Sequence, residues 1–173
     1  MIELLRKRRS IRKYKATPVD QKSIDILIEA LLRSPSSRNN KPWLFVVVDD
    51  RELLGKLSKA KESGSAFLKD APLGIVVCAD TAKSDVWVED CAIAAILVQA
   101  TAESLGLGSC WIQIRKRPHN SNKTAEEYIR EFLNLPEQIN VASIISIGYP
   151  DEVKAPITNS ELDFHKIQRN RLT

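Results

Sequence analysis

The sequence predicts one domain that combines helices with strands. Its 173 residues are enough to bury one sizeable core and few for two. Short apolar runs rich in valine or isoleucine have the length and composition of buried strands, and the segments around them carry apolar residues at helical spacing. The chain is 43% hydrophobic and 28% charged, and it has no apolar run near the roughly 18 residues of a membrane span. We therefore expect a soluble protein without a membrane partner.

The helices are predicted from apolar periodicity and from residues that begin or end a helix. A short first helix carries Ile2, Leu4 and Leu5 and ends near Arg9. The clearest helix has Asp20 as its N-cap and stops before Ser34-Pro35, because the residue before a proline is pushed out of the α region. Further helices are expected over residues 51–62, ended by Gly64; over the mostly apolar residues 86–105, ended by Gly106; and from residue 123 to a point before Pro136.

The strands are predicted from runs that are apolar but too short for buried helices. They are residues 44–48 (LFVVV), 73–79 (LGIVVCA), 109–114 (SCWIQI) and 142–149 (ASIISIGY). The last stretch, 150–173, has only scattered apolar residues and cannot form a core of its own. It is either disordered or laid across another surface, such as a partner subunit.

Several kinds of chemistry are disfavoured by the residues present. The chain opens with charged residues and has no secretory signal, so we expect a cytoplasmic protein. Cys78, Cys91 and Cys110 form no C-x-x-C pair, which predicts neither a disulfide framework nor a zinc site. His119 and His165 lie far apart in sequence and no nucleophile motif is present, so we expect no metal and no catalytic acid, base or nucleophile. An enzyme of this composition would need a cofactor that brings its own chemistry.

Basic residues are concentrated near the start of the chain. The net charge is +4, and seven of the 26 lysine and arginine residues lie within residues 6–15. The run RRSIRKY at 8–14 combines guanidinium groups with a hydroxyl, a mixture that suits a phosphate monoester; its candidate ligands are Arg8, Arg9, Ser10 and Arg12. The alternative is a solvated basic face or a nucleic-acid arm. Tyr14 is the only aromatic residue among these charges, and 22 acidic residues offset the rest, so compact anion binding is favoured over nucleic acid.

Two further segments are weak signals when taken singly. The loop SPSSRNNKPW at 34–43 is stiffened by prolines and lined by hydrogen-bonding groups, but such residues also make ordinary surface turns. The segment GLGSCWIQ at 106–113 leads from a helix into a strand, the reverse of the dinucleotide fingerprint, so a Rossmann site is not predicted. By itself it indicates a helix C-cap and a buried strand.

Taken together and in this order, these segments resemble the nitroreductase family of FMN-dependent oxidoreductases. RRSIRKY is similar to the family motif R-[RH]-S-x-[RK], SPSSRNNKPW to P-S-[SG]-x-N-x-[QE]-P-W, and GLGSCWIQ to G-L-G-x-x-W. LNLPE at 133–137 and IGYP at 147–150 resemble the family's closing segments. The resemblance spans most of residues 2–152, and the joint occurrence is more specific than any one motif.

The resemblance implies an α+β fold, with a mixed, largely antiparallel sheet flanked by helices. It also implies an intertwined homodimer with two FMN sites at the interface and a C-terminal extension that wraps the partner. The chain would then be a single domain, 1–173, whose residues 150–173 pack on the other subunit.

The resemblance also assigns site residues by motif. The FMN phosphate, ribityl chain and pyrimidine edge would be held by Arg8, Arg9, Ser10 and Arg12. The ring would be approached from the other subunit by Pro35, Ser36, Ser37 and Asn39. The stretch passing N5 and O4 of the ring would be Trp111, Ile112 and Gln113.

The sequence departs from the family pattern in places. Lys41 stands where glutamine or glutamate is usual, and AAILVQA at 94–100 departs from the usual central-helix motif. The family commonly has a tail cation that completes the phosphate site; here the candidates are Lys154, Lys166 and Arg169. The region that usually covers the substrate pocket is short, which leaves the acceptor open.

The implied function is transfer of hydride from NAD(P)H through flavin N5 to a small organic acceptor by a ping-pong mechanism. The acceptor could be a nitroaromatic, a quinone, an enone or free flavin. The alternative is a flavin- or nucleotide-binding protein without efficient turnover, suggested by the altered tail and central helix.

Overall fold

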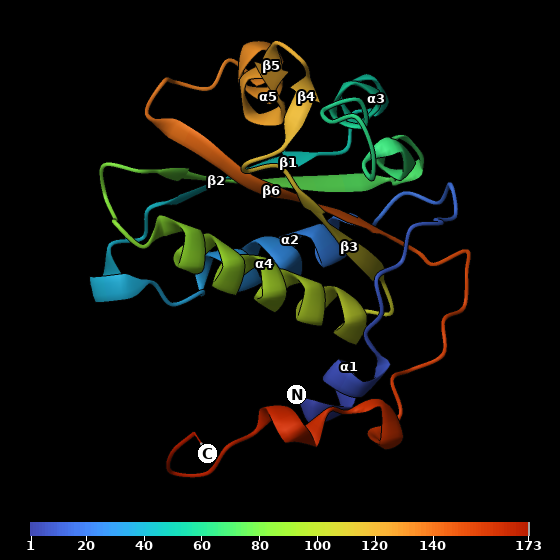
Figure 1. The fold of residues 1–173 in the computed structure, drawn as a ribbon. Coiled ribbons are helices and arrows are strands. Elements are labelled where there is room, and N and C mark those ends of the chain that lie inside the picture. The colour runs from blue at the N-terminus through green and yellow to red at the C-terminus, as the bar shows by residue number, and fades with distance from the viewer. Residues whose placement is uncertain (173) are drawn as a thin grey trace.

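A computed structural model describes residues 1–172, and its centre is a four-stranded sheet (Figure 1). The strands lie in the order β1 (Trp43–Val48), β2 (Leu73–Asp80), β6 (Ile139–Gly148) and β3 (Gly108–Gln113), and each pairs antiparallel with its neighbours. The four predicted strands and the α+β fold with a largely antiparallel sheet are therefore confirmed. A small hairpin of β4 (Pro118–Asn120) and β5 (Lys123–Thr124) was not predicted.

Helices cover both faces of the sheet, because the two central strands are buried on both sides. Residues 73–79 of β2 are all buried, so both faces need apolar cover. Figure 1 shows α2 (Gln21–Leu32) and α4 (Trp87–Ser104) below the sheet, with α3 (Arg51–Leu57) and α5 (Ala125–Leu133) above it. Alternate residues of β2 divide between the two cores: Ile75 and Val77 face α2 and α4, whereas Val76 and Cys78 face α3 and α5.

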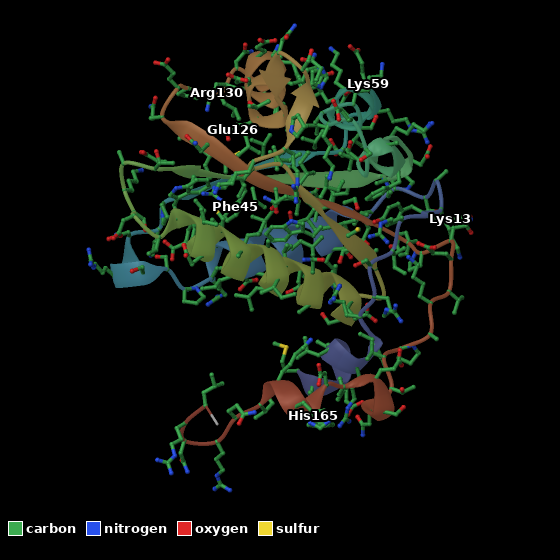
Figure 2. The ribbon with its side chains drawn as sticks, in the orientation of Figure 1. Lys13, Phe45, Lys59, Glu126, Arg130 and His165 are labelled. Atoms are coloured by element: carbon green, nitrogen blue, oxygen red, sulfur yellow. The ribbon has the colours of Figure 1, made fainter. Side chains whose placement is uncertain are left out.

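Local side-chain bonds set where several helices begin. Asp20 accepts the Ser23 backbone N–H at 2.9 Å, which confirms Asp20 as the N-cap of α2. Thr124 and Glu127 form a capping box at the start of α5. On α5, Glu126 and Arg130 pair at 3.1 Å and both bond the backbone of β6, which fixes the helix on the sheet (Figure 2).

One predicted helix boundary is wrong, and one prediction about burial is only partly right. The helix expected over 51–62 ends at Leu57, where Ser58 turns the chain. The first helix, α1 (Ile2–Lys7), has Arg8 as its C-cap and so ends near Arg9, as predicted. The central helix α4 is largely buried, but Ile93 and Ile96 are 39% and 41% exposed in the single chain. One stripe of α4 therefore lacks a cover.

The C-terminal extension forms no core, as predicted. Within residues 150–172, its regular elements are the 3₁₀ turns η3 (Asn159–Glu161) and η4 (Phe164–Lys166). The large apolar side chains are exposed, at Val153, Ile157, Leu162, Phe164, Ile167 and Leu172. The extension returns toward the N-terminal helix α1 (Figure 1), and residue 173 lies outside the described residues. Within residues 1–172, no helix has both the length and the apolar character needed to cross a membrane.

The chain after α1 lies against β3 because Gly108 has no side chain. A Cβ at Gly108 would lie 2.8 Å from Ile11 Cβ and Cγ1, closer than such atoms ever approach. Ile11 is buried, and its position fixes the path of residues 8–15. Glycine at this position is thus what lets the N-terminal segment reach the sheet.

We expect Gly108→Ala to destabilise the protein by roughly 1–3 kcal/mol, because Ile11 or the strand must move. Urea unfolding measures the change. Gly55→Ala is the matched control: Gly55 lies in α3 with no atom within 4 Å of an added Cβ, and alanine there should stabilise by up to about 1 kcal/mol. Equal effects of the two substitutions would contradict the close approach.

Candidate functional site

The basic N-terminal segment is attached along the start of β3 and the end of β6. Ser10 forms a parallel bridge with Ser109, and the Ile11 N–H donates to the Ser109 carbonyl at 3.0 Å. Tyr14 forms an antiparallel bridge with Pro150, and its hydroxyl donates to the Ile11 carbonyl at 2.6 Å. The RRSIRKY run therefore behaves as a short added strand with a fixed register.

Three cationic side chains lie near the Cys110 thiol, where this segment meets β3. Burial raises the pKa of Cys110, while Arg12, Lys154 and Arg8 act in the opposite direction through their positive charge. Lys154 also donates to the Ser10 carbonyl at 2.6 Å. We call Arg8, Arg12 and Lys154 the cationic cluster. Positive groups this close to one another favour an anion between them.

Glu152 contacts two members of the cationic cluster, the Arg12 backbone and the Lys154 side chain. Its carboxylate accepts the backbone N–H groups of Arg12 at 2.5 Å and Lys13 at 3.2 Å, and it pairs with Lys154 at 3.4 Å. One carboxylate thus links the N-terminal segment to the start of the tail. Sequence reasoning missed Glu152, and only its place directly after IGYP-D could have indicated it.

The other predicted cations differ in position. Arg9 donates to the Ala155 carbonyl and so is engaged with the tail. Among the tail candidates, Lys166 pairs with Asp163 at 3.4 Å and Arg169 is exposed, whereas Lys154 lies at Ser10. Lys154 is therefore the tail cation that the fold brings to the cluster.

One edge of β3 is open beyond the cluster. The Ser109 carbonyl points away from β6, toward Ile11, and backbone groups of alternate residues point to the same side of a strand. Trp111 and Gln113 therefore present their N–H and C=O groups on that outer side. Within residues 1–172, no strand pairs with β3 there beyond the Ser109 bridge. Ile112 points its side chain into the core instead, where it is fully buried.

The loop at 34–43 has a strained backbone, and the buried Asp90 carboxylate accepts one of its backbone N–H groups. Arg38, Asn39 and Lys41 all have left-handed backbone angles, with φ of 50°, 57° and 48°. Such residues persist only where the surroundings impose them, and they concentrate at functional sites. Asp90, 2% exposed, accepts the Ser37 N–H at 2.7 Å and the Ser84 hydroxyl at 3.0 Å. Sequence reasoning missed Asp90, because Glu89 and Asp90 stand side by side at the start of the apolar helix and nothing in the sequence distinguishes the buried one.

The structure does not bring this loop to the cationic cluster of the same chain. The loop is tied to Asp90 in the first turn of α4, whereas the cluster lies beside Ser109, which follows the other end of that helix. Asp90 and Ser104 are separated by about 21 Å along α4 at 1.5 Å per residue. Figure 1 shows η1 (Ser37–Asn39) and the segment after α1 on opposite sides of the chain. Arg8, Ser10, Arg12 and the start of β3 thus form one group, and Pro35, Ser36, Ser37 and Asn39 another.

The remaining titratable groups offer no nucleophile or metal centre in the described part of the chain. Burial raises the pKa of Cys78 and of Cys91 to about 12, so both are neutral thiols near pH 7. No group of three or more His, Cys, Asp or Glu side chains among residues 1–172 could hold a metal ion.

Comparison with known proteins finds consistent similarity over nearly the whole chain. The family model described as "Nitroreductase family" matches residues 5–64 and 54–149. A protein of Archaeoglobus fulgidus, provisionally named NADH dehydrogenase/NAD(P)H nitroreductase, is 38% identical over 157 residues, 88% of this chain and 87% of that one. FMN reductase [NAD(P)H] of Bacillus subtilis is 31% identical over 90% of this chain and 68% of its own.

Solved structures show the same similarity in three dimensions. The structure described as an FMN-dependent nitroreductase from Clostridium difficile R20291 superposes with a TM-score of 0.98 at 49% identity. The match covers 99% of this chain and 100% of that one.

We expect Glu152→Gln to remove an acid-sensitive part of the stability. Accepting the Arg12 N–H lowers the pKa of Glu152 below 4.5, so its contribution is present above about pH 4.5 and is lost as the pH falls through the folded-state pKa. Urea unfolding between pH 7 and pH 3 should show the wild type above the variant at pH 7 and the two converging in acid. Glu137→Gln, at an exposed carboxylate, is the control and should give a pH-independent difference near zero. A constant gap for Glu152→Gln would refute this role.

Proposed function

The chain belongs to the nitroreductase family, and on that premise we propose that it carries hydride from NAD(P)H to a small organic acceptor in a ping-pong cycle. Flavin-dependent oxidoreduction with FMN is its general activity; the acceptor and the order of steps are the proposal. The observation that carries it is the cationic cluster at the head of the open edge of β3.

The residues of the cluster fit the phosphate end of FMN. Arg8, Arg12 and Lys154 supply positive charge on one side of Ser10, whose hydroxyl is directed at the Cys110 thiol within the same group. A phosphate monoester needs several donors on one small anion, and guanidinium and ammonium groups give strong charge-assisted bonds to it. Glu152 fixes the Arg12 backbone and the Lys154 side chain before binding, which reduces the entropy lost on binding.

The open edge of β3 fits the polar rim of the flavin ring. The outward N–H groups of Trp111 and Gln113 are donors that no described strand uses, and the Trp111 indole is itself held by Gln113 Oε1 at 3.0 Å. Bound FMN supplies acceptance and release of hydride, so the chain needs no acid, base or nucleophile of its own. The protein's task is to orient the ring and to exclude water from it.

We also propose that the site is completed by a second copy of the chain. The strained loop with Pro35, Ser36, Ser37 and Asn39 cannot meet the cluster of its own chain, as shown by their places at opposite ends of α4. Ile93 and Ile96 on α4 and the apolar side chains of the tail are exposed, as expected for surfaces that a homodimer buries. Residues 150–173 would then lie on the partner subunit, and the three thiols would stay reduced in the cytoplasm.

The acceptor belongs to the class of nitroaromatics, quinones, enones and free flavin. Donor and acceptor would use one pocket in turn, which is why the cycle is ping-pong. A binding protein without turnover was suggested by the altered tail and the altered central helix, and the position of Lys154 at Ser10 weakens the first of these two reasons.

Purified protein should be yellow, and anaerobic NADH or NADPH should bleach the absorbance of its flavin. Addition of a quinone or a nitroaromatic should then restore the colour without loss of FMN. Bound flavin that neither donor bleaches would contradict turnover, and protein that neither contains nor binds FMN would contradict the whole proposal.

Arg8→Ala and Arg12→Ala should each weaken FMN binding by about tenfold or more, because a charge-assisted bond to phosphate contributes about 1.5–3 kcal/mol. Flavin fluorescence quenching measures the affinity, and circular dichroism checks the fold. Lys13→Ala is the matched control, since Lys13 is exposed on the outside of this segment (Figure 2). Full flavin occupancy in both arginine variants would refute the phosphate assignment.

A mixed dimer tests the shared site directly. Asn39→Ala should also lose FMN, and co-expression with Arg8→Ala should restore flavin to isolated mixed dimers at about one site of the two. Each mixed dimer then has one site with both substitutions and one with neither. If each chain held its own complete site, no mixture would recover flavin.

A further inference from the structure

A second pair of cations lies beside a surface hollow that the proposed function has not used. Lys61 follows α3, and Arg117 precedes the β4–β5 hairpin; both line a cavity of about 220 Å³ with Glu62, Ser63 and Pro118. We call it the Lys61–Arg117 hollow. A larger hollow of about 390 Å³ adjoins it at Arg117 and Pro118 and is lined mostly by polar residues of the hairpin.

The two cations line the same small hollow, and within residues 1–172 neither is paired with a carboxylate. Lys61 is half-buried, and its pKa is lowered first by burial and then by the positive charge of Arg117. In the described part of the chain, neither side chain takes part in an ion pair. Glu62, which also lines the hollow, pairs with neither. Two like charges held together are unfavourable alone and become favourable around a shared anion.

The backbone holds this pair in place, so its closeness is built into the fold. The Nδ1 atom of His119 in the hairpin forms a hydrogen bond with the carbonyl of Ala60, the residue before Lys61, at 3.2 Å. The same ring stacks on Tyr128 of α5. These contacts join the turn that carries Lys61 to the hairpin that follows Arg117. Arg117 donates its N–H to the Ile114 carbonyl at 3.0 Å and accepts from the Ala125 N–H at 2.9 Å. Lys61 Nζ lies over Gly64, 3.4 Å from where a Cβ would be.

The hollow lies next to the proposed flavin site. The positive charges of Arg12 and Arg8 oppose the rise that burial causes in the pKa of Cys110, and Lys61 also lies within electrostatic range of this thiol. Arg12 lies 5.8 Å from the centre of the Phe67 ring, in the segment η2 (Ala66–Asp70) that follows the Lys61 turn. Phe67 and Ala60, which precedes Lys61, pack in the same core on the α3 side of the sheet, so Arg12 and the Lys61 turn lie on that side.

We propose that the Lys61–Arg117 hollow binds a phosphate group of the nicotinamide dinucleotide donor. The inference rests on the proposed function, since it names a contact for the donor that reduces the flavin. A dinucleotide carries phosphate at a distance from its nicotinamide, so a cationic pair beside the flavin site rather than within it suits such a ligand. The phosphate would be either the 2′-phosphate of NADPH or the diphosphate common to NADH and NADPH.

The binding test uses FMN-saturated protein, so that the cationic cluster is already filled. Adenosine 2′,5′-bisphosphate and inorganic pyrophosphate are titrated calorimetrically into the wild type, Lys61→Gln and Arg117→Gln. Each substitution should weaken binding about tenfold or more, the effect of one charge-assisted bond. Lys61→Arg, which keeps the charge, should retain most of the affinity. Lys59→Gln is the matched control, because Lys59 is exposed and does not line the hollow.

Steady-state kinetics then distinguish the two phosphates. A rise in KM for NADPH alone, with kcat unchanged, identifies the 2′-phosphate, and an equal rise for both donors identifies the diphosphate. Equal binding of the probes by wild type and Lys61→Gln, or equal weakening by Lys59→Gln, would overturn the proposal. If neither donor bleaches the flavin, the proposed function fails, and the calorimetric result still decides whether the hollow binds phosphate.

Discussion

The backbone pairing of Ser10 with Ser109 is the contact on which the rest of the candidate site depends. It places Arg8 and Arg12 beside the head of β3, and it gives Lys154 the Ser10 carbonyl to bind. The pairing is possible because Gly108 leaves room for Ile11. A basic segment that would otherwise be a solvated arm thereby acquires a fixed register against the sheet. Glu152 extends the same contact to the tail, so the N-terminal and C-terminal parts of the site are ordered together.

An open sheet edge is normally a liability, because its free N–H and C=O groups can pair with another chain. Here the edge of β3 begins at a cationic cluster and continues past Trp111 and Gln113, which makes it suitable for an anionic, planar ligand with a polar rim. The strained backbone of the 34–43 loop is also unfavourable by itself and is typical of functional sites. Left-handed angles at Arg38, Asn39 and Lys41 occur in a loop that Asp90 holds, and within residues 1–172 this loop does not meet the cationic cluster. Both features are expected if, as proposed, a ligand and a second chain complete the site.

The positive side chains near β3 form two separate groups, one at Ser10 and one at Lys61 and Arg117. The cluster at Ser10 and the pair at Lys61 each bring like charges together at a position that the backbone fixes, and both act on the Cys110 region. Repulsion within each group is unfavourable, and the anion binding that we propose would offset it. A flavin phosphate and a donor phosphate would need two such places, close enough for hydride transfer and separate enough for the donor to leave while the flavin stays.

The sequence by itself determined the strands, most helix boundaries, the family and the basic RRSIRKY run, because apolar periodicity, capping residues and ordered motifs are local properties. It did not determine which tail cation reaches the cluster, since Lys154, Lys166 and Arg169 differ only in where the fold carries them. Nor did it reveal Glu152, Asp90 or the pairing of Lys61 with Arg117, whose partners lie far away in the chain. The tertiary structure decided these points, because closeness in space between distant residues depends on how the sheet brings its edges, turns and helix ends together.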